Sequence, residues 1–116
     1  GFNIILVDQN KDEMAQVKAS VENSNPSDKF KVFIMTQQAD EWKDYETLCD
    51  GLKEISGGSQ NISVLVNNVE EKDTKGAKFH KAEDSEIVQT INVNTFPLVF
   101  MTRFLGPSMK ARVKEG

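Results

Sequence analysis

The sequence predicts an α/β fold with a parallel sheet, and three short apolar runs separated by helical stretches support this prediction. The runs are "FNIILV" (2–7), "FKVFIM" (30–35) and "ISVLV" (62–66), and two of them are almost continuously apolar. Strands that are buried on both faces of a parallel sheet have this composition. The stretches between the runs are long enough for the crossover that parallel strands need. We therefore expect three parallel strands and three or four helices.

The stretch between the first and second runs has the spacing of an amphipathic helix, expected near 11–23. Asn10 can cap its start, and Glu13 three residues later completes a pair that resembles a capping box. The segment "NSNPSD" (23–28) ends the helix. The predicted inner face consists of Met14, Val17 and Val21.

A second helix is expected near 40–55, because apolar residues recur there at helical spacing and two glycines follow. The charged stretch 70–85 is expected to be a surface loop. Helical spacing resumes over 86–112, with an interruption around Asn92–Pro97 because proline disfavours the helix interior. The predicted stripe of the second helix consists of Trp42, Tyr45, Leu48, Cys49, Leu52 and Ile55.

The composition excludes several classes of function. The net charge is −4 and the basic residues are scattered, which disfavours a nucleic-acid partner. The chain contains no apolar stretch of the roughly 20 residues that a membrane span needs. Cys49 is the single cysteine, so no internal disulfide forms and a reducing compartment fits. His80 is the single histidine, and without a Cys/His cluster we expect no metal site.

The order and spacing of three segments resemble the short-chain dehydrogenase/reductase family. The segments are "IILVD", "VLVNNV" and "INVNTFPLVFMTRFLGPSMKAR". In that family the fourth strand ends in Asn-Asn-Ala-Gly, and a later helix carries an asparagine ahead of a Pro-x-Met segment. The counterparts here are Asn67-Asn68-Val69-Glu70, then Asn94, then Pro107–Met109. Val69 in place of alanine resembles the branch of the 3-ketoacyl-CoA reductases and 17β-hydroxysteroid dehydrogenases.

This resemblance covers essentially the whole chain and implies a single partial Rossmann-like domain, with a doubly wound parallel sheet, over residues 1–116. By the same resemblance, Asp8 accepts hydrogen bonds from the adenosine ribose and repels the 2′-phosphate of NADP, which favours NAD. The alternative for Asp8 is a residue that caps or turns the chain after the strand.

Four further residues receive a role from the resemblance. Asn67, Asn68 and Val69 would approach the cofactor at the carboxyl edge of the sheet, where open α/β sheets bind ligands. The alternative is a plain Asn-Asn turn. Asn94 would be the catalytic asparagine that helps to hold a water molecule in the proton relay. The alternative is a polar residue at a helix start.

Compared with the family, the chain looks like an internal segment that lacks the first strand, its glycine-rich turn and the Ser/Tyr/Lys region. Acid–base chemistry of this kind needs a tyrosine beside a lysine. The single tyrosine, Tyr45, is followed four residues later by Cys49. Glu70 replaces the motif's glycine, and Thr36 replaces a family aspartate that meets the adenine. We expect the segment to be inactive by itself and to hold no cofactor.

The family's strand order is 3-2-1-4, which places the absent strand between 2–7 and 62–66. Each buried unpaired backbone group costs roughly 1–3 kcal/mol. The two runs would therefore pair directly with each other, leave a gap in the sheet, or self-associate through their edges.

The sequence supports one leading function and two alternatives. The first is a segment of an NAD(P)-dependent oxidoreductase that takes a dinucleotide and a small lipophilic carbonyl or hydroxyl substrate, such as a 3-ketoacyl-CoA or a steroid. The second is a non-catalytic Rossmann-like module kept for assembly or partner binding. A receiver-like signalling domain is disfavoured, because "ISVLVNN" offers no phosphorylatable aspartate. An intracellular location is expected, and the resemblance is compatible with the endoplasmic reticulum.

Overall fold

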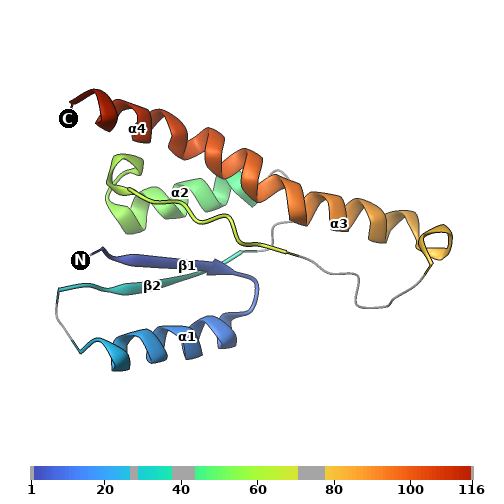
Figure 1. Ribbon diagram of the computed structural model, residues 1–116, viewed down its shortest axis with the longest axis horizontal. Helices are drawn as coiled ribbons and strands as arrows, with labels where there is room; N and C mark the ends of the chain where they lie inside the picture. The colour runs from blue at the N-terminus through green and yellow to red at the C-terminus, as the bar shows by residue number, and fades with distance from the viewer. Residues whose placement is uncertain (1, 27–28, 38–43, 71–77, 116) are drawn as a thin grey trace. The chain divides into compact units, whose positions relative to one another are not determined.

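The computed structural model describes residues 2–26, 29–37, 44–70 and 78–115. These residues fall into two compact units, Gly1–Gln38 and Ala39–Gly116. The elements in chain order are β1 (Ile4–Asp8), α1 (Lys11–Ser24), β2 (Val32–Thr36), α2 (Asp44–Ser56), η1 (Ser59–Asn61), η2 (Phe79–Lys81), α3 (Asp84–Phe96), η3 (Pro97–Met101) and α4 (Thr102–Glu115), as Figure 1 shows.

The first unit is a β-α-β element with a parallel strand pair. β1 and β2 are paired in register from Ile4 opposite Val32 to Asp8 opposite Thr36. Helix α1 joins the strands and packs against both of them (Figure 1). Met14 from α1 and Val32 from β2 are its buried residues. The first two predicted strands and their parallel direction are therefore confirmed.

Helix α1 begins where the sequence predicts it. The Asn10 side chain accepts a hydrogen bond of 3.1 Å from the Glu13 backbone N–H, which satisfies one of the free donors at a helix start. The predicted inner face is narrower than expected. Met14 is buried and Val21 is half-buried, but Val17 is exposed. A two-stranded pair is too narrow to cover a wide helix face, which accounts for this difference.

The second unit is built on α2 and on a long helical segment that runs from α3 to α4. Tyr45 stacks on Phe100 with ring centres 5.1 Å apart, and Phe96 packs edge-on against both rings. The predicted stripe is confirmed within α2, while Trp42 lies outside the described residues. The buried core of this unit consists of Tyr45, Leu48, Leu52, Pro97, Met101 and Leu105.

The predicted interruption of the last helix takes the form of a π-helical turn. The helix continues through Asn92, and the widened turn η3 begins at Pro97. Proline lacks the N–H that an α-helix needs, and its ring crowds the carbonyl four residues earlier. A π turn accommodates this locally, and the Thr102 N–H is shared between the carbonyls of Leu98 and Val99. Within the described ranges, no helix has the length and apolar character needed to cross a membrane.

The prediction of a third strand at 62–66 is wrong for this structure. The described residues form a two-stranded sheet, and residues 62–70 form neither helix nor strand. Val64 and Val66 are 65% and 78% exposed. A strand exists only with a hydrogen-bonded neighbour, and no described strand pairs with this run.

Two other predictions concern domain and loop boundaries. The single-domain organisation over residues 1–116 stays a prediction. In the stretch 70–85, which was expected to be a loop, residues 71–77 lie outside the described part. The remainder contains the short helix η2 and the start of α3. Helix α3 begins at Asp84, where the backbone N–H of Glu83 donates to Glu86 Oε2 at 3.4 Å.

Candidate functional site

The carboxyl edge of the β1–β2 pair carries Asp8 and Thr36 side by side in register. Both residues are exposed. Asp8 Oδ1 accepts a 2.8 Å hydrogen bond from the Asn10 backbone N–H, so the carboxylate also shapes the turn into α1. A carboxylate has about four acceptor positions, so Asp8 retains capacity for a ligand. Ligands of open α/β sheets bind at this edge.

The predicted cofactor residues Asn67, Asn68 and Val69 lie in the second unit, in the segment 62–70. All three are exposed, so their side chains are accessible to a ligand. An amide side chain both donates and accepts hydrogen bonds. Glu70, which stands where the family motif has glycine, follows them and is exposed as well.

The start of the segment 62–70 is held by Arg112 from α4. Arg112 Nη1 donates to the Gln60 carbonyl oxygen at 2.6 Å and to Ser63 Oγ at 3.2 Å. Arg112 Nη2 donates to the Ile62 carbonyl oxygen. In addition, the hydroxyls of Ser59 and Ser108 are hydrogen-bonded at 3.1 Å. Three hydrogen bonds from one side chain and the serine pair therefore connect α4 to the chain just ahead of the predicted cofactor residues.

Sequence reasoning did not identify Arg112. Its acceptors lie 49 to 52 residues away along the chain, so no local pattern connects them. An arginine in the last turns of a helix can hydrogen-bond the last carbonyls of that same helix, so the sequence also offers local partners.

Asn94 lies on α3 and is exposed. Its Nδ2 donates to the Thr90 carbonyl oxygen at 2.8 Å, one helical turn earlier. The residue is therefore inside the helix rather than at its start, and its catalytic role stays a prediction. Asn94 belongs to the same unit as Asn67, Asn68 and Val69, whereas Asp8 belongs to the first unit.

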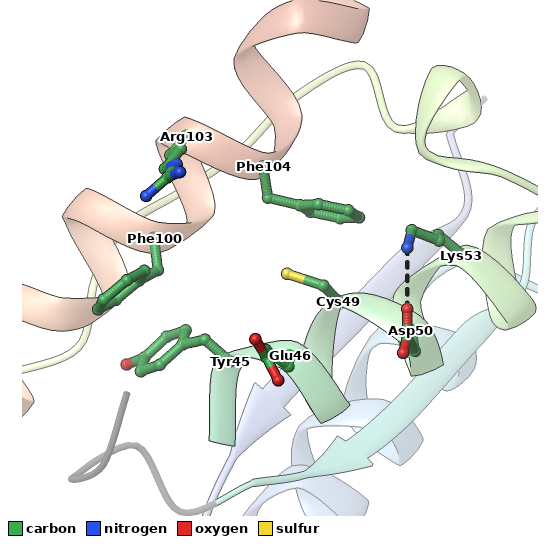
Figure 2. A pocket seen from close by; sticks show the side chains of 8 residues that line it. All are labelled: Tyr45, Glu46, Cys49, Asp50, Lys53, Phe100, Arg103 and Phe104. Carbon is green, nitrogen blue, oxygen red and sulfur yellow. Dashed lines mark hydrogen bonds and ion pairs between the residues drawn. The ribbon is translucent and has the colours of Figure 1, made fainter. Parts of the chain in front are cut away.

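An open groove of about 620 Å³ lies between α2 and the helical segment η3–α4 (Figure 2). The Cys49 side chain points toward the space between Phe100 and Phe104 (Figure 2). Lys53 Nζ pairs with Asp50 Oδ1 at 2.8 Å and lies 5.5 Å from the centre of the Phe104 ring. None of the predicted site residues lines this groove. Its lining consists of Tyr45, Glu46, Cys49, Asp50, Lys53, Phe100, Arg103 and Phe104.

Two groups in the lining have shifted pKa values, Cys49 and Lys53, and neither shift favours a reactive nucleophile. Burial raises the pKa of the Cys49 thiol above its ordinary value, so the thiolate is scarce at neutral pH. The hydrogen bond to Asp50 raises the pKa of Lys53, which keeps the ammonium charged. Tyr45 is 3% exposed and belongs to the core of the unit. No cluster of three or more potential metal ligands occurs in the described part of the chain.

The chain is similar to known proteins in both sequence and structure. The family model for short chain dehydrogenase matches residues 1–116. A very-long-chain 3-oxoacyl-CoA reductase of Kluyveromyces lactis is 27% identical over 114 residues, covering 98% of this chain and 31% of the relative. A Caenorhabditis elegans protein named as a steroid dehydrogenase is 27% identical over 114 residues, covering 97% of this chain and 41% of the relative.

The fold has a counterpart among solved structures. The L-sorbose reductase of Gluconobacter frateurii, solved with NADPH and L-sorbose, matches with a TM-score of 0.73 and 19% identity. The match covers 95% of this chain and 39% of the reductase. This likeness confirms the α/β Rossmann-like fold class. Because the family model matches every residue from 1 to 116, the chain belongs to the short-chain dehydrogenase family.

Proposed function

We propose that residues 1–116 supply part of the dinucleotide site of an NAD(P)-dependent oxidoreductase that acts on carbonyl or hydroxyl substrates. The observation that carries this proposal is the exposed Asp8 carboxylate at the carboxyl end of β1, beside Thr36. In a dinucleotide-binding fold this is the place where a carboxylate meets the adenosine ribose. Membership of the short-chain dehydrogenase family supplies the reaction class.

The preferred cofactor in this proposal is NAD rather than NADP. Asp8 uses one oxygen for the Asn10 N–H, and its remaining acceptor positions fit the two ribose hydroxyls of NAD. The additional 2′-phosphate of NADP would bring a second negative charge against the carboxylate. The L-sorbose reductase was solved with NADPH. The NAD preference proposed for this chain therefore differs from the cofactor bound in that protein.

The exposed amides of Asn67 and Asn68, with Val69, contribute to the cofactor side of this site. Asn94 contributes to the proton relay by holding a water molecule. The groups that exchange a proton with the substrate require a tyrosine and a neighbouring lysine, and residues 1–116 contain no Tyr-x-x-x-Lys sequence. Residues 1–116 by themselves should therefore show no turnover.

The substrate class we favour is a 3-oxoacyl-CoA or a steroid carbonyl. Support comes from the relatives, which are named very-long-chain 3-oxoacyl-CoA reductase and steroid dehydrogenase. The chain spans about a third of the length of the reductase relatives, 31% in the Kluyveromyces lactis protein. The activity therefore belongs to a protein that contains these residues together with the acid–base pair.

The test of this function uses the protein that contains residues 1–116. Binding of NADH and NADPH is titrated by nicotinamide fluorescence, and turnover is assayed with a long-chain 3-oxoacyl-CoA and a steroid ketone. We expect NADH to bind more tightly, and Asp8→Asn to weaken NADH binding about tenfold, because a hydrogen bond to a charged group contributes about 1.5–3 kcal/mol. Asp12→Asn, an exposed carboxylate on α1, is the matched control. NADPH preference, or an Asp8→Asn protein that binds NADH normally, would contradict the assignment.

A second candidate function is a non-catalytic module kept for assembly or partner binding, and Glu70 favours it. Its carboxylate stands where the family motif brings a glycine backbone close to the cofactor. The same titration separates the two candidates. If Glu70 has closed a former dinucleotide site, the unsubstituted protein binds neither nucleotide and Glu70→Gly gains binding. If the oxidoreductase proposal is correct, NADH binds before any substitution.

A further inference from the structure

We propose that Arg112 is a positioning residue that fixes the register of the segment 62–70 and thereby holds Asn67, Asn68 and Val69 at the dinucleotide. The proposal rests on the function given above. Its basis is the set of hydrogen bonds from Arg112 to the carbonyl oxygens of Gln60 and Ile62 and to Ser63 Oγ.

The chemistry of the guanidinium suits this task. Its five N–H donors form a rigid planar fork, so one side chain bonds several acceptors at fixed separations. Hydrogen bonds from a charged donor are shorter and stronger than neutral ones. Neither of the two ion pairs found among the described residues involves Arg112. Its charge therefore acts on the backbone at the start of the segment.

The segment pairs with no strand among the described residues, and the hydrogen bonds from Arg112 fix its first residues. A slip by one residue would move the chain by about 3.3 Å and exchange the two faces of an extended run. A misplacement of about 1 Å in a binding site can cost roughly 100-fold in rate. Asn67 lies five residues after Ile62. A slip at Ile62 would therefore be transmitted directly to the amides.

Helix α4, which carries Arg112, is itself held in place by buried and hydrogen-bonded side chains. Leu105 on α4 is 1% exposed, and Ser108 bonds Ser59 at 3.1 Å. On the other side, the turn between α2 and η1 has a defined backbone. Gly57 and Gly58 have φ angles of 71° and 130°, which favour glycine. Helix α4 and the turn between α2 and η1 therefore both have a defined conformation, and Arg112 connects α4 to the chain that follows this turn.

The test compares Arg112→Ala, Arg112→Lys and the control Lys110→Ala in the protein that contains this segment. Lys110→Ala removes one positive charge from an exposed position on the same helix. Three quantities are measured, namely the Kd for NADH, the hydrogen exchange of residues 62–69 and the melting temperature. We expect Arg112→Ala to raise the Kd for NADH about tenfold or more and to accelerate exchange over 62–69, as loss of a charge-assisted anchor implies.

Arg112→Lys restores only part of the affinity, because an ammonium cannot match the planar fork, and Lys110→Ala changes the Kd less than about twofold. A lower melting temperature with an unchanged Kd would overturn the positioning role and leave only a structural one. An unchanged exchange rate at 62–69 would overturn the anchor itself. If the unsubstituted protein fails to bind NADH, the proposed function falls and the cofactor role of Arg112 with it, while the exchange data still decide whether Arg112 holds the segment.

Discussion

The runs Ile4–Asp8 and 62–66 are similar in sequence but are held in different ways. Both are short and rich in isoleucine and valine. The first ends at Asp8 and the second is followed by Asn67, residues that are predicted to approach the cofactor. β1 has a complete ladder with β2 and a covering helix α1. The run 62–66 pairs with no strand among the described residues, and Val66 is 78% exposed.

This difference shows that strand propensity and strand formation are separate properties. Propensity reflects how well a side chain fits a pleated, half-buried surface. Formation needs a neighbouring backbone that takes up the N–H and C=O groups. In β1 the register is set by five paired residues, whereas in 62–66 it is set by one guanidinium at the first residues. The two predicted halves of the cofactor site therefore have different mechanical support.

The largest change in stability should come from Leu105→Ala. This substitution truncates a fully buried side chain of α4, the helix that also carries Arg112. We expect a loss of about 2–5 kcal/mol in the free energy of unfolding, from lost burial and the remaining cavity. Urea denaturation followed by circular dichroism at a helix wavelength measures it. Val113→Ala on the same helix, at an 82% exposed position, is the matched control and should cost less than about 0.5 kcal/mol. Equal costs would mean that α4 is not anchored at Leu105.

A charge placed in each run tests the comparison directly. Leu6→Lys in the half-buried β1 should cost about 1–3 kcal/mol, because the ammonium loses hydration there. Val66→Lys in residues 1–116 should change stability by less than about 0.5 kcal/mol, because the position is exposed. The measurement is the urea midpoint of each variant. A Val66→Lys cost as large as that of Leu6→Lys would show that 62–66 is covered in solution.

A smaller effect is expected at the start of α1, the helix that covers β1 and β2. Asn10→Ala removes the side chain that accepts the Glu13 N–H and should cost about 1 kcal/mol. Gln16→Ala, at an exposed position inside the same helix, is the control and should be nearly neutral. Thermal unfolding of both variants measures the difference. Exchange over 62–66 should be unaffected by Asn10→Ala, and a faster exchange there would contradict separate support of the two runs.

Local patterns predicted the elements that depend on local contacts. The cap at Asn10, the stripe of α2 and the break introduced by Pro97 all follow from residues within one or two helical turns. The parallel direction of β1 and β2 followed from the length of their helical crossover. The family resemblance, which rested on Asn67-Asn68-Val69 and Asn94, was confirmed by the match over the whole chain.

The features that were not predicted depend on contacts between distant residues. Arg112 acts on backbone atoms about 50 residues earlier, and the state of 62–66 depends on which strand lies beside it. Neither is encoded by spacing within one segment. The roles of Asp8, Asn67, Asn68, Val69 and Asn94 stay predictions, because each depends on a ligand as well as on the fold.

The smallest effect concerns Cys49 on α2, in the unit that carries 62–66. Burial raises the pKa of this thiol above its ordinary 9.0, and the nearby Lys53 partly offsets the rise. The folded chain thus prefers the neutral thiol. This contribution to stability is fully present below pH 9.0 and is lost as the pH rises through the folded-state pKa. Unfolding free energies from about pH 8 to about pH 10.5 should therefore fall more for the unsubstituted chain than for Cys49→Ser.

Lys53→Ala should slow alkylation of Cys49 by iodoacetamide, because removing the cation raises the thiol pKa further. Faster alkylation in Lys53→Ala would show that Lys53 shields the groove sterically instead of acting through its charge.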